Sequence, residues 1–226
     1  MLELHLGDCF EIMATMPDKS VDHIITDPPY SDRVHKGARG GNEAKKTLHQ
    51  NNSLIAFKCF TEDDFINFCT EGLRITKRWM ILTCDSLHAA QAEKEGLPVI
   101  RVGAWIKPNS APQFTGDRPG VGWETVLILH PEGKKKWNDG GHHAVWIYNI
   151  VHGQHPTKKP PALIKKWIEQ FTDLGETIFD PFMGEGTVGE CALQMGRNFK
   201  GVEIEPGWYE LAKQQIEAQE SQLVLF

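Results

Sequence analysis

The stretch Ile178-Phe179-Asp180-Pro181-Phe182-Met183-Gly184-Glu185-Gly186-Thr187 has the pattern of a strand that runs into a glycine-rich turn and then into a helix. Glycine lets a ligand lie against the backbone, and a helix N-terminus presents free N–H groups. Gly184, Gly186 and Gly189 fit the pattern G-x-G-x-x-G, and Glu203 follows at the end of the next predicted strand. A carboxylate there suits ribose hydroxyls, so the stretch predicts a site for an adenosine-type cofactor. The alternative is a tight structural turn with a solvated glutamate.

Two cofactors fit such a site, NAD and S-adenosylmethionine. Only residues 204–226 follow Glu203, too few to complete a dinucleotide-binding fold downstream of it. Asp180 precedes the glycines, where a carboxylate suits an α-amino group and repels a pyrophosphate. Both observations favour S-adenosylmethionine. The small number of residues after Glu203 also requires that the other strands come from residues 1–130.

Predicted strands and helices alternate along the chain. The strands are expected at residues 2–6, 21–26, 79–83, 99–106, 123–129, 177–179 and 199–204, and helices at 9–16, from 61, at 86–95, from 160, near 188–195 and near 208–216. This alternation predicts an α/β protein whose mostly parallel sheet is covered by helices on both faces. Because the cofactor strand comes late, we expect a circularly permuted order. A length of 226 residues predicts a single domain, 1–226.

The composition is that of an ordinary globular protein, with 40% hydrophobic and 24% charged residues, which excludes a disordered or collagen-like chain. No long apolar run or secretory signal is visible, so we expect no membrane span and a cytoplasmic location. Five cysteines without C-x-x-C spacing predict reduced thiols. The pair His142-His143 is typical of a solvated loop, and no metal is expected. A net charge of -6 argues against a bulk nucleic-acid binder.

A second motif, Asp27-Pro28-Pro29-Tyr30, directly follows a predicted strand. The prolines remove N–H donors, so the strand end presents two acceptors, the Asp27 carboxylate and the Pro28 carbonyl. An exocyclic amino group has two hydrogens for such a pair, and Tyr30 offers a ring that stacks on a flat base. The alternative is an Asp-Pro-Pro turn with a core tyrosine.

With both motifs present, the chain resembles the β class of DNA amino-methyltransferases, in which the catalytic motif precedes the cofactor motif, and in particular its small phage- or prophage-like members. The resemblance covers most of the chain. The matching segments are Leu6-Gly7-Asp8-Cys9, Ser20-Val21-Asp22, Asp27 to Tyr30, Trp105 to Asn109, Trp123-Glu124, His155 to Pro160, Asp180 to Thr187 and Gly201 to Glu205. It implies a Rossmann-like S-adenosylmethionine-dependent methyltransferase fold.

The resemblance also implies the cofactor-binding residues. These are Asp8, Cys9, Thr157, Lys158, Asp180, Phe182, Gly184, Gly186, Thr187 and Glu203. Asp8 would accept the adenine amino group of the cofactor, Thr157 and Lys158 would meet the methionine carboxylate, and Glu203 would hold the ribose. The chain departs from the family pattern twice, because the family often has glutamine where Lys159 or its neighbour stands, and serine where Glu185 stands.

The implied activity is methyl transfer from S-adenosylmethionine to the N6 amino group of a flipped adenine, with Asp27, Pro28, Pro29 and Tyr30 as the catalytic residues. An aspartate in this motif favours adenine, because the N4-cytosine members more often carry serine. Methylation of cytosine N4 or of RNA stays open, as does a catalytically silent nucleic-acid-binding homologue. A role in restriction-modification is a further expectation.

Double-stranded DNA is the expected partner. Candidate phosphate contacts are Arg33, Lys36, Arg39, Lys45, Lys46, Lys134, Lys135 and Lys136, although charge runs are usually just solvated faces. Residues 31–56 are expected to form a mobile substrate loop, and residues 107–154 a short recognition region. Because no separate recognition domain fits, we expect either a short, relaxed target specificity or a homodimer partner that supplies part of the reading surface. Local basic loops on an acidic chain predict weak, salt-sensitive DNA binding.

Overall fold

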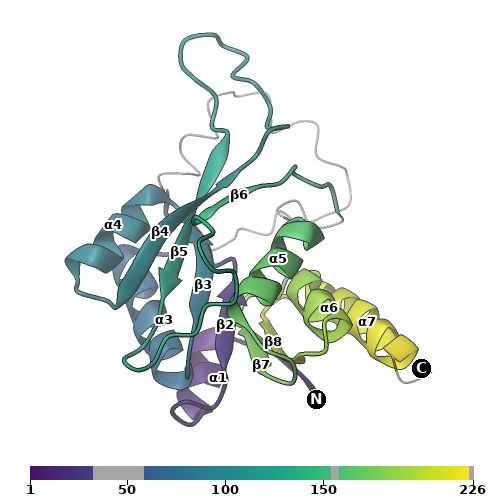
Figure 1. Ribbon diagram of the computed structural model, residues 1–226. Coiled ribbons are helices and arrows are strands. Elements are labelled where there is room, and N and C mark those ends of the chain that lie inside the picture. Colours follow the sequence, from purple (N-terminus) through teal and green to yellow (C-terminus); the bar gives the residue numbers. More distant parts are fainter. Residues whose placement is uncertain (33–58, 154–157, 224–226) are drawn as a thin grey trace.

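The computed structural model describes residues 1–32, 59–153 and 158–223. Within them, eight strands form one sheet in the order β1-β8-β7-β2-β3-β5-β4-β6 (Figure 1). The strands are β1 (Leu2–Leu6), β2 (His23–Thr26), β3 (Met80–Cys84), β4 (Val99–Ile106), β5 (Trp123–Leu129), β6 (Val145–Ile147), β7 (Thr177–Asp180) and β8 (Asn198–Glu203). The helices are α1 (Cys9–Thr15), α3 (Glu62–Ile75), α4 (Ser86–Lys94), α5 (Pro161–Phe171), α6 (Thr187–Gln194) and α7 (Pro206–Leu223).

The predicted α/β fold is confirmed, with a sheet that is parallel except for β5. The cofactor strand β7 lies inside the sheet between β8 and β2, although it is the seventh strand along the chain. That arrangement is the permuted order expected from the sequence. The carboxyl ends of β1, β2, β7 and β8 therefore share one edge of the sheet, where ligands of open α/β folds bind.

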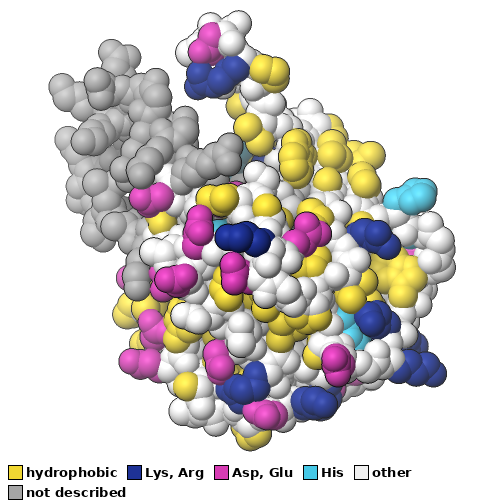
Figure 2. Space-filling model, turned by 90° about the vertical axis from the view of Figure 1, so that its left-hand side faces the viewer, with side chains coloured by type: hydrophobic (Ala, Val, Ile, Leu, Met, Phe, Trp, Pro, Cys, Tyr) yellow, Lys and Arg dark blue, Asp and Glu magenta, His cyan; other side chains and the backbone are white. Residues whose placement is uncertain are grey.

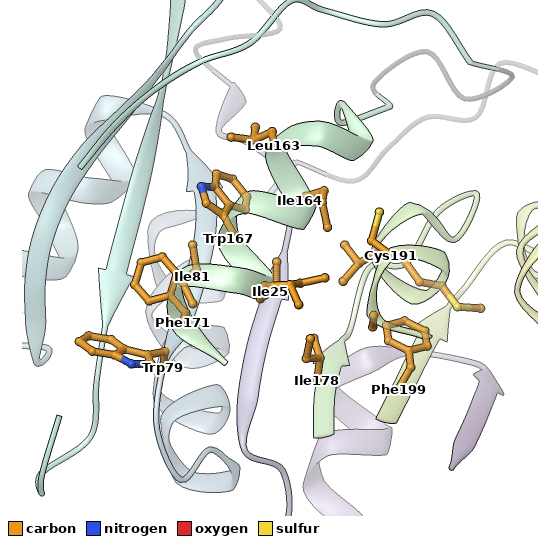
Figure 3. Close-up of a cluster of buried hydrophobic side chains, with 14 of the residues drawn as sticks. Ile25, Trp79, Ile81, Leu163, Ile164, Trp167, Phe171, Ile178, Cys191 and Phe199 are labelled. Atoms are coloured by element: carbon orange, nitrogen blue, oxygen red, sulfur yellow. The ribbon is translucent and has the colours of Figure 1, made fainter. Parts of the chain in front are cut away.

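Helices cover both faces of the sheet with separate hydrophobic clusters. On one face α5, α6 and α7 pack against the strands, and Trp167, Ile164 and Phe199 are among the fully buried side chains there (Figure 3). On the other face α1, α3 and α4 enclose a cluster that includes Phe65 and Phe68. Each buried side chain of this size contributes about 1.5–3 kcal/mol of hydrophobic free energy. Two such cores hold the strand ends in fixed positions.

Local sequence signals set several helix boundaries. The side chains and backbones of Thr61 and Asp64 form a reciprocal capping box at the start of α3, as the spacing of these residues predicts. Pro160 and Pro161 open α5. The short edge strand β6 was not predicted, because three residues after a polar, turn-rich segment carry too little periodicity. No helix in the described ranges is both long and apolar enough to cross a bilayer.

Candidate active site

The predicted catalytic motif lies at the carboxyl end of β2, in the middle of the sheet. β2 ends at Thr26, and Asp27, Pro28, Pro29 and Tyr30 follow it directly. Pro28 is buried, whereas Asp27 and Tyr30 are partly exposed. Because proline lacks an N–H, the strand end presents acceptors to a partner, as the sequence predicts.

Both carboxylate oxygens of Asp27 accept a hydrogen bond. Oδ1 accepts from the hydroxyl of Thr83, near the end of β3, and Oδ2 accepts from the ammonium of Lys159, 2.5 Å away. The Asp27 side chain is 24% exposed and that of Lys159 is 11% exposed. These contacts fix the orientation of the carboxylate from two different elements.

A second carboxylate, Glu124 in β5, joins the same group. Its Oε2 accepts a hydrogen bond from the Tyr30 hydroxyl at 2.9 Å and lies 3.6 Å from Nζ of Lys159, and its Oε1 pairs with Lys107 at 2.9 Å. Burial opposes the ionisation of Glu124, but the two ammonium groups outweigh burial and lower its pKa. We call Asp27, Tyr30, Lys107, Glu124 and Lys159 the ionic network.

The glycine-rich turn follows the neighbouring strand β7. Gly184 and Gly186 have φ values of 52° and 91°, in the left-handed region that favours glycine. A Cβ at Gly186 would lie 3.2 Å from the Cα of Ala212 in α7, so this helix packs against the turn. Phe182 packs edge-on against two aromatic rings on the α3 side of the sheet. Thr187 begins α6, whose first N–H groups have no partner inside the helix.

Glu203 ends β8 beside this turn. Its Oε2 accepts a hydrogen bond from the N–H of Gly184 and its Oε1 accepts from the N–H of Glu205, both at 2.9 Å. Each carboxylate oxygen has a second lone pair, so Glu203 retains acceptor capacity for a pair of hydroxyls. Burial raises its pKa. This geometry is compatible with the predicted role toward a ribose.

Asp180, the last residue of β7, is 2% exposed. Its Oδ1 accepts hydrogen bonds from the Thr26 hydroxyl at 2.6 Å and from the Phe182 N–H at 3.1 Å. Burial first, and then the negative charges of Asp27 and Glu203, raise its pKa to about 7. Among the described residues no cation pairs with it. A buried carboxylate in these surroundings is suited to an ammonium group supplied by a ligand.

The hydrogen bond between Thr26 and Asp180 connects the two motifs. These residues lie 154 positions apart in the sequence, yet they end adjacent parallel strands. The structure therefore places the predicted catalytic motif directly beside the glycine-rich turn of residues 180–187, which we call the cofactor turn because a cofactor is predicted to bind there. A methyl donor bound at the turn and an amino group bound at Asp27 would share one edge of the sheet.

Asp8 and Cys9 follow β1, which lies beyond β8 on the side of the cofactor turn away from Asp27. Leu6 of β1 is paired with Glu203, which brings the start of α1 to the same edge of the sheet. The Asp8 side chain caps α1 by accepting a hydrogen bond from the N–H of Phe10 at 2.8 Å. Cys9 is buried, and burial raises the pKa of its thiol to about 12. Contact of Asp8 and Cys9 with a cofactor stays a prediction.

Glu185, one of the positions where the chain departs from the family pattern, lies beside Lys158, the neighbour of Lys159. The ammonium of Lys158 forms an ion pair with Oε1 of Glu185, and the Glu185 side chain is 4% exposed. The main chain at Gly153 lies against both side chains. Lys158 therefore balances the extra negative charge that Glu185 places in the cofactor turn. Its predicted contact with a methionine carboxylate stays a prediction.

A double-mutant cycle measures this ion pair. Lys158→Met removes the cation that faces Glu185, and we expect it to lower the free energy of unfolding. Lys158→Met/Glu185→Gln is expected to recover most of the loss, because a buried pair is costly to break but not to replace. Denaturant unfolding of the four proteins should give a coupling of about 1–3 kcal/mol. Additive losses would contradict a direct pair.

The basic cluster of residues 134–136 lies at the opposite edge of the sheet from Asp27. It follows β5, which runs antiparallel to its neighbours and ends at that edge. The Lys136 ammonium pairs with Asp173 at 2.5 Å, and the Lys136 carbonyl accepts a hydrogen bond from the indole of Trp79. Lys134, Lys135 and Lys136 are exposed. The structure does not bring this cluster together with the catalytic motif, and its contact with DNA stays a prediction.

Six predicted residues lie outside the described residues. They are Arg33, Lys36, Arg39, Lys45, Lys46 and Thr157. Most of the predicted substrate loop, residues 31–56, lies there too. The predicted recognition region, residues 107–154, contains β5 and β6, so part of it belongs to the central sheet. Its role in recognition stays a prediction.

A family model described as DNA methylase matches residues 21–214. The chain belongs to this family. Among its curated relatives, the type II methyltransferase M2.DpnII of Streptococcus pneumoniae is 27% identical over 97% of this chain and 90% of the relative. The type II methyltransferase M.HinfI of Haemophilus influenzae is 26% identical over 93% of this chain and 67% of the relative.

Solved structures agree with this membership. The complex of M1.HpyAVI with S-adenosylmethionine is 25% identical, has a TM-score of 0.67, and is matched over 96% of this methylase and 99% of that chain. The cytosine-N4-specific PvuII methyltransferase is 14% identical with a TM-score of 0.72, over 97% of this chain and 90% of that one, and shows the shared fold alone. The predicted family, the permuted fold and S-adenosylmethionine as the cofactor are confirmed.

Three residues that contact the predicted catalytic motif of this DNA methylase were not singled out from the sequence. Thr83, Glu124 and Lys159 all contact Asp27 or Tyr30. Glu124 and Lys159 lie in segments that resemble the family, and this resemblance was the one feature of the sequence that could have drawn attention to them. Their proximity to Asp27 depends on the placement of β5 and of the start of α5, which spacing along the chain does not reveal.

Proposed function

We propose that this DNA methylase transfers a methyl group from S-adenosylmethionine to the N6 amino group of adenine. The observation that carries the proposal is the Thr26–Asp180 hydrogen bond, which joins Asp27 and its prolines to the cofactor turn. Aspartate as the first residue of the catalytic motif is the feature that favours adenine. Cytosine N4 is the second candidate, because the PvuII enzyme has the same fold.

The residues of the cofactor turn fit S-adenosylmethionine. Asp180 is a buried carboxylate without a cation among the described residues, as a site for an α-ammonium group requires. Gly184 and Gly186 leave the backbone accessible, and Glu203 keeps acceptor capacity for the ribose hydroxyls. When bound, the cofactor supplies an electrophilic methyl group on its sulfonium. Asp180, the turn and Glu203 would hold and orient it.

The catalytic motif binds the amino group that receives the methyl. With the base flipped out of the duplex, Asp27 and the Pro28 carbonyl accept its two N–H hydrogen bonds, which directs the nitrogen lone pair out of ring conjugation. Tyr30, whose hydroxyl is held by Glu124, stacks on the base. The nitrogen–carbon bond forms as the carbon–sulfur bond breaks, and the positive charge that develops on nitrogen is stabilised by Asp27. The proton leaves afterwards, so no strong general base is required.

The DNA surface and the assembly are further parts of the proposal. On the face drawn in Figure 2, lysine and arginine side chains are interspersed with aspartate and glutamate, without a continuous basic surface. Such a charge distribution agrees with weak, salt-sensitive DNA binding, supported by the predicted phosphate contacts Arg33, Lys36, Arg39, Lys45 and Lys46. A homodimer would add a second surface, and sedimentation of the purified protein tests it.

The experiment that tests the proposed function is expression in cells free of DNA methylation, followed by sequencing that detects modified bases. Methyladenine at a recurring sequence context supports the proposal. Methylcytosine at N4 supports the second candidate instead. A genome without either modification, alongside folded protein that binds S-adenosylmethionine, contradicts both.

A further inference from the structure

The ammonium of Lys159 lies between the two carboxylates of the ionic network. Its Nζ is 2.5 Å from Oδ2 of Asp27 and 3.6 Å from Oε2 of Glu124. Its backbone immediately precedes Pro160, the N-cap residue of α5, so the main chain is anchored while the long side chain retains rotatable bonds. One buried cation thus has two anionic partners at different distances, and a change of rotamer can exchange them.

Lys159 at Asp27 conflicts with the chemistry proposed for Asp27. The target nitrogen gains positive charge as it takes up the methyl group, and it must do so beside Asp27. Two positive charges about 4 Å apart repel each other by roughly 4 kcal/mol at the effective dielectric of a protein surface. Burial opposes the charge on Lys159, but Asp27 and Glu124 outweigh burial and raise its pKa, so it stays an ammonium. The conflict is therefore relieved by moving the ammonium.

Glu124 is placed to receive this ammonium. Its Oε1 is occupied by Lys107, whereas its Oε2 accepts the Tyr30 hydroxyl and already lies within 3.6 Å of Lys159. The rings of Tyr30 and Trp105 lie 6.0 and 5.9 Å from Nζ of Lys159, and aromatic faces attract a cation. A displaced ammonium thus stays among favourable partners.

We infer that Lys159 is a positioning residue that exchanges its ion pair during base entry. It holds the Asp27 carboxylate in place, and when the amino group of the target base reaches Asp27, the ammonium pairs with Glu124 instead. The inference rests on the proposed function and assigns Glu124 the role of acceptor for the displaced ammonium. No covalent bond changes in this step, and the cation only exchanges one carboxylate for the other.

Glu124→Gln tests the exchange, because the amide keeps an acceptor for the Tyr30 hydroxyl but removes the charge that receives Lys159. We expect the single-turnover rate constant to fall about tenfold or more and the KM for DNA to rise. Lys159→Met/Glu124→Gln should be faster than Glu124→Gln, because no ammonium then competes for Asp27. A purely structural network gives no such recovery, since the second substitution removes a further contact.

The matched control is Glu93→Gln, an exposed carboxylate on α4. Calorimetric titration with S-adenosylmethionine should be alike for all variants, and thermal unfolding should show that each variant is folded at the assay temperature. The inference is overturned by a Glu124→Gln protein that is as fast as the wild type, or by a double variant that is no faster than Glu124→Gln. In either case, methylation of DNA by the wild type still upholds the proposed function. A wild-type protein that leaves DNA unmodified in the same assay overturns both.

Discussion

Asp27→Ala is expected to abolish methyl transfer while leaving the affinity for S-adenosylmethionine nearly unchanged. Asp27 is the acceptor that stabilises charge on the target nitrogen, and loss of one such preorganised partner typically costs about 10²–10³-fold in rate. In this variant the Glu124 carboxylate keeps its hydrogen bonds from the Tyr30 hydroxyl and the Lys107 ammonium. The carboxylate that faces the cofactor turn, Asp180, is untouched by the substitution.

Single-turnover methylation of DNA measures the loss, and calorimetric titration measures cofactor binding. Asp63→Ala serves as the matched control, because Asp63 is an exposed carboxylate in the first turn of α3. We expect the control to methylate DNA at the wild-type rate. An Asp27→Ala protein that methylates within tenfold of the wild type would exclude Asp27 as the acceptor, and one that loses cofactor binding equally would make its role structural.

The fold followed from the sequence because its signals are local. The pattern of residues 178–187 predicted a strand, a glycine-rich turn and a helix, and the alternation of strands and helices along the chain predicted a sheet covered on both faces. Parallel strands end at a common edge, so Asp27, Asp180 and Glu203 could be expected near one another from their positions after strands alone. β6 was not predicted, because its three residues form a strand only by pairing with β4, and the sequence does not reveal that pairing.

The contacts within the ionic network could be predicted from the sequence only in part. Asp27 and Tyr30 were predicted from their motif, but Glu124 reaches them because antiparallel β5 begins at the edge where β2 and β3 end. Lys159 reaches Asp27 from 132 positions away, from the segment that directly precedes α5. Such contacts depend on strand order and helix packing, which a single sequence does not specify. The pairing of Lys158 with Glu185 likewise became apparent only in the structure, although Glu185 was visible in the sequence as a departure from the family pattern.

Asp180→Asn is expected to stabilise the protein at alkaline pH and to weaken cofactor binding. Burial and the neighbouring carboxylates raise the pKa of Asp180 from its ordinary 3.8 to about 7. The folded protein therefore holds this proton more tightly than the unfolded chain does. Its contribution to stability is fully present below pH 3.8 and is lost as the pH rises toward 7, by an amount of order 4 kcal/mol.

Denaturant unfolding without cofactor, measured from pH 5 to 8.5, tests this direction of the pH dependence of stability. The wild-type free energy of unfolding should fall between pH 5 and 7, and Asp180→Asn should remove that part of the slope while keeping an acceptor for the Thr26 hydroxyl. The exposed Asp63→Asn is the control. An Asp180→Asn protein with the wild-type pH slope would show that Asp180 does not titrate in this range.

Cofactor binding should also depend on the ionisation of Asp180, but a rise in pH that weakens the free protein should strengthen binding. An ammonium group beside Asp180 favours its ionised form, so S-adenosylmethionine should recover the stability that the wild type loses as the pH rises to 7. The increase in Tm on cofactor addition should therefore be larger at pH 8 than at pH 6 in the wild type, and nearly independent of pH in Asp180→Asn. Such a result would mean that the buried Asp180 carboxylate, which destabilises the free protein, is compensated by the ammonium group of the bound cofactor. An equal increase in Tm for the wild type and Asp180→Asn at pH 8 would rule out this interpretation.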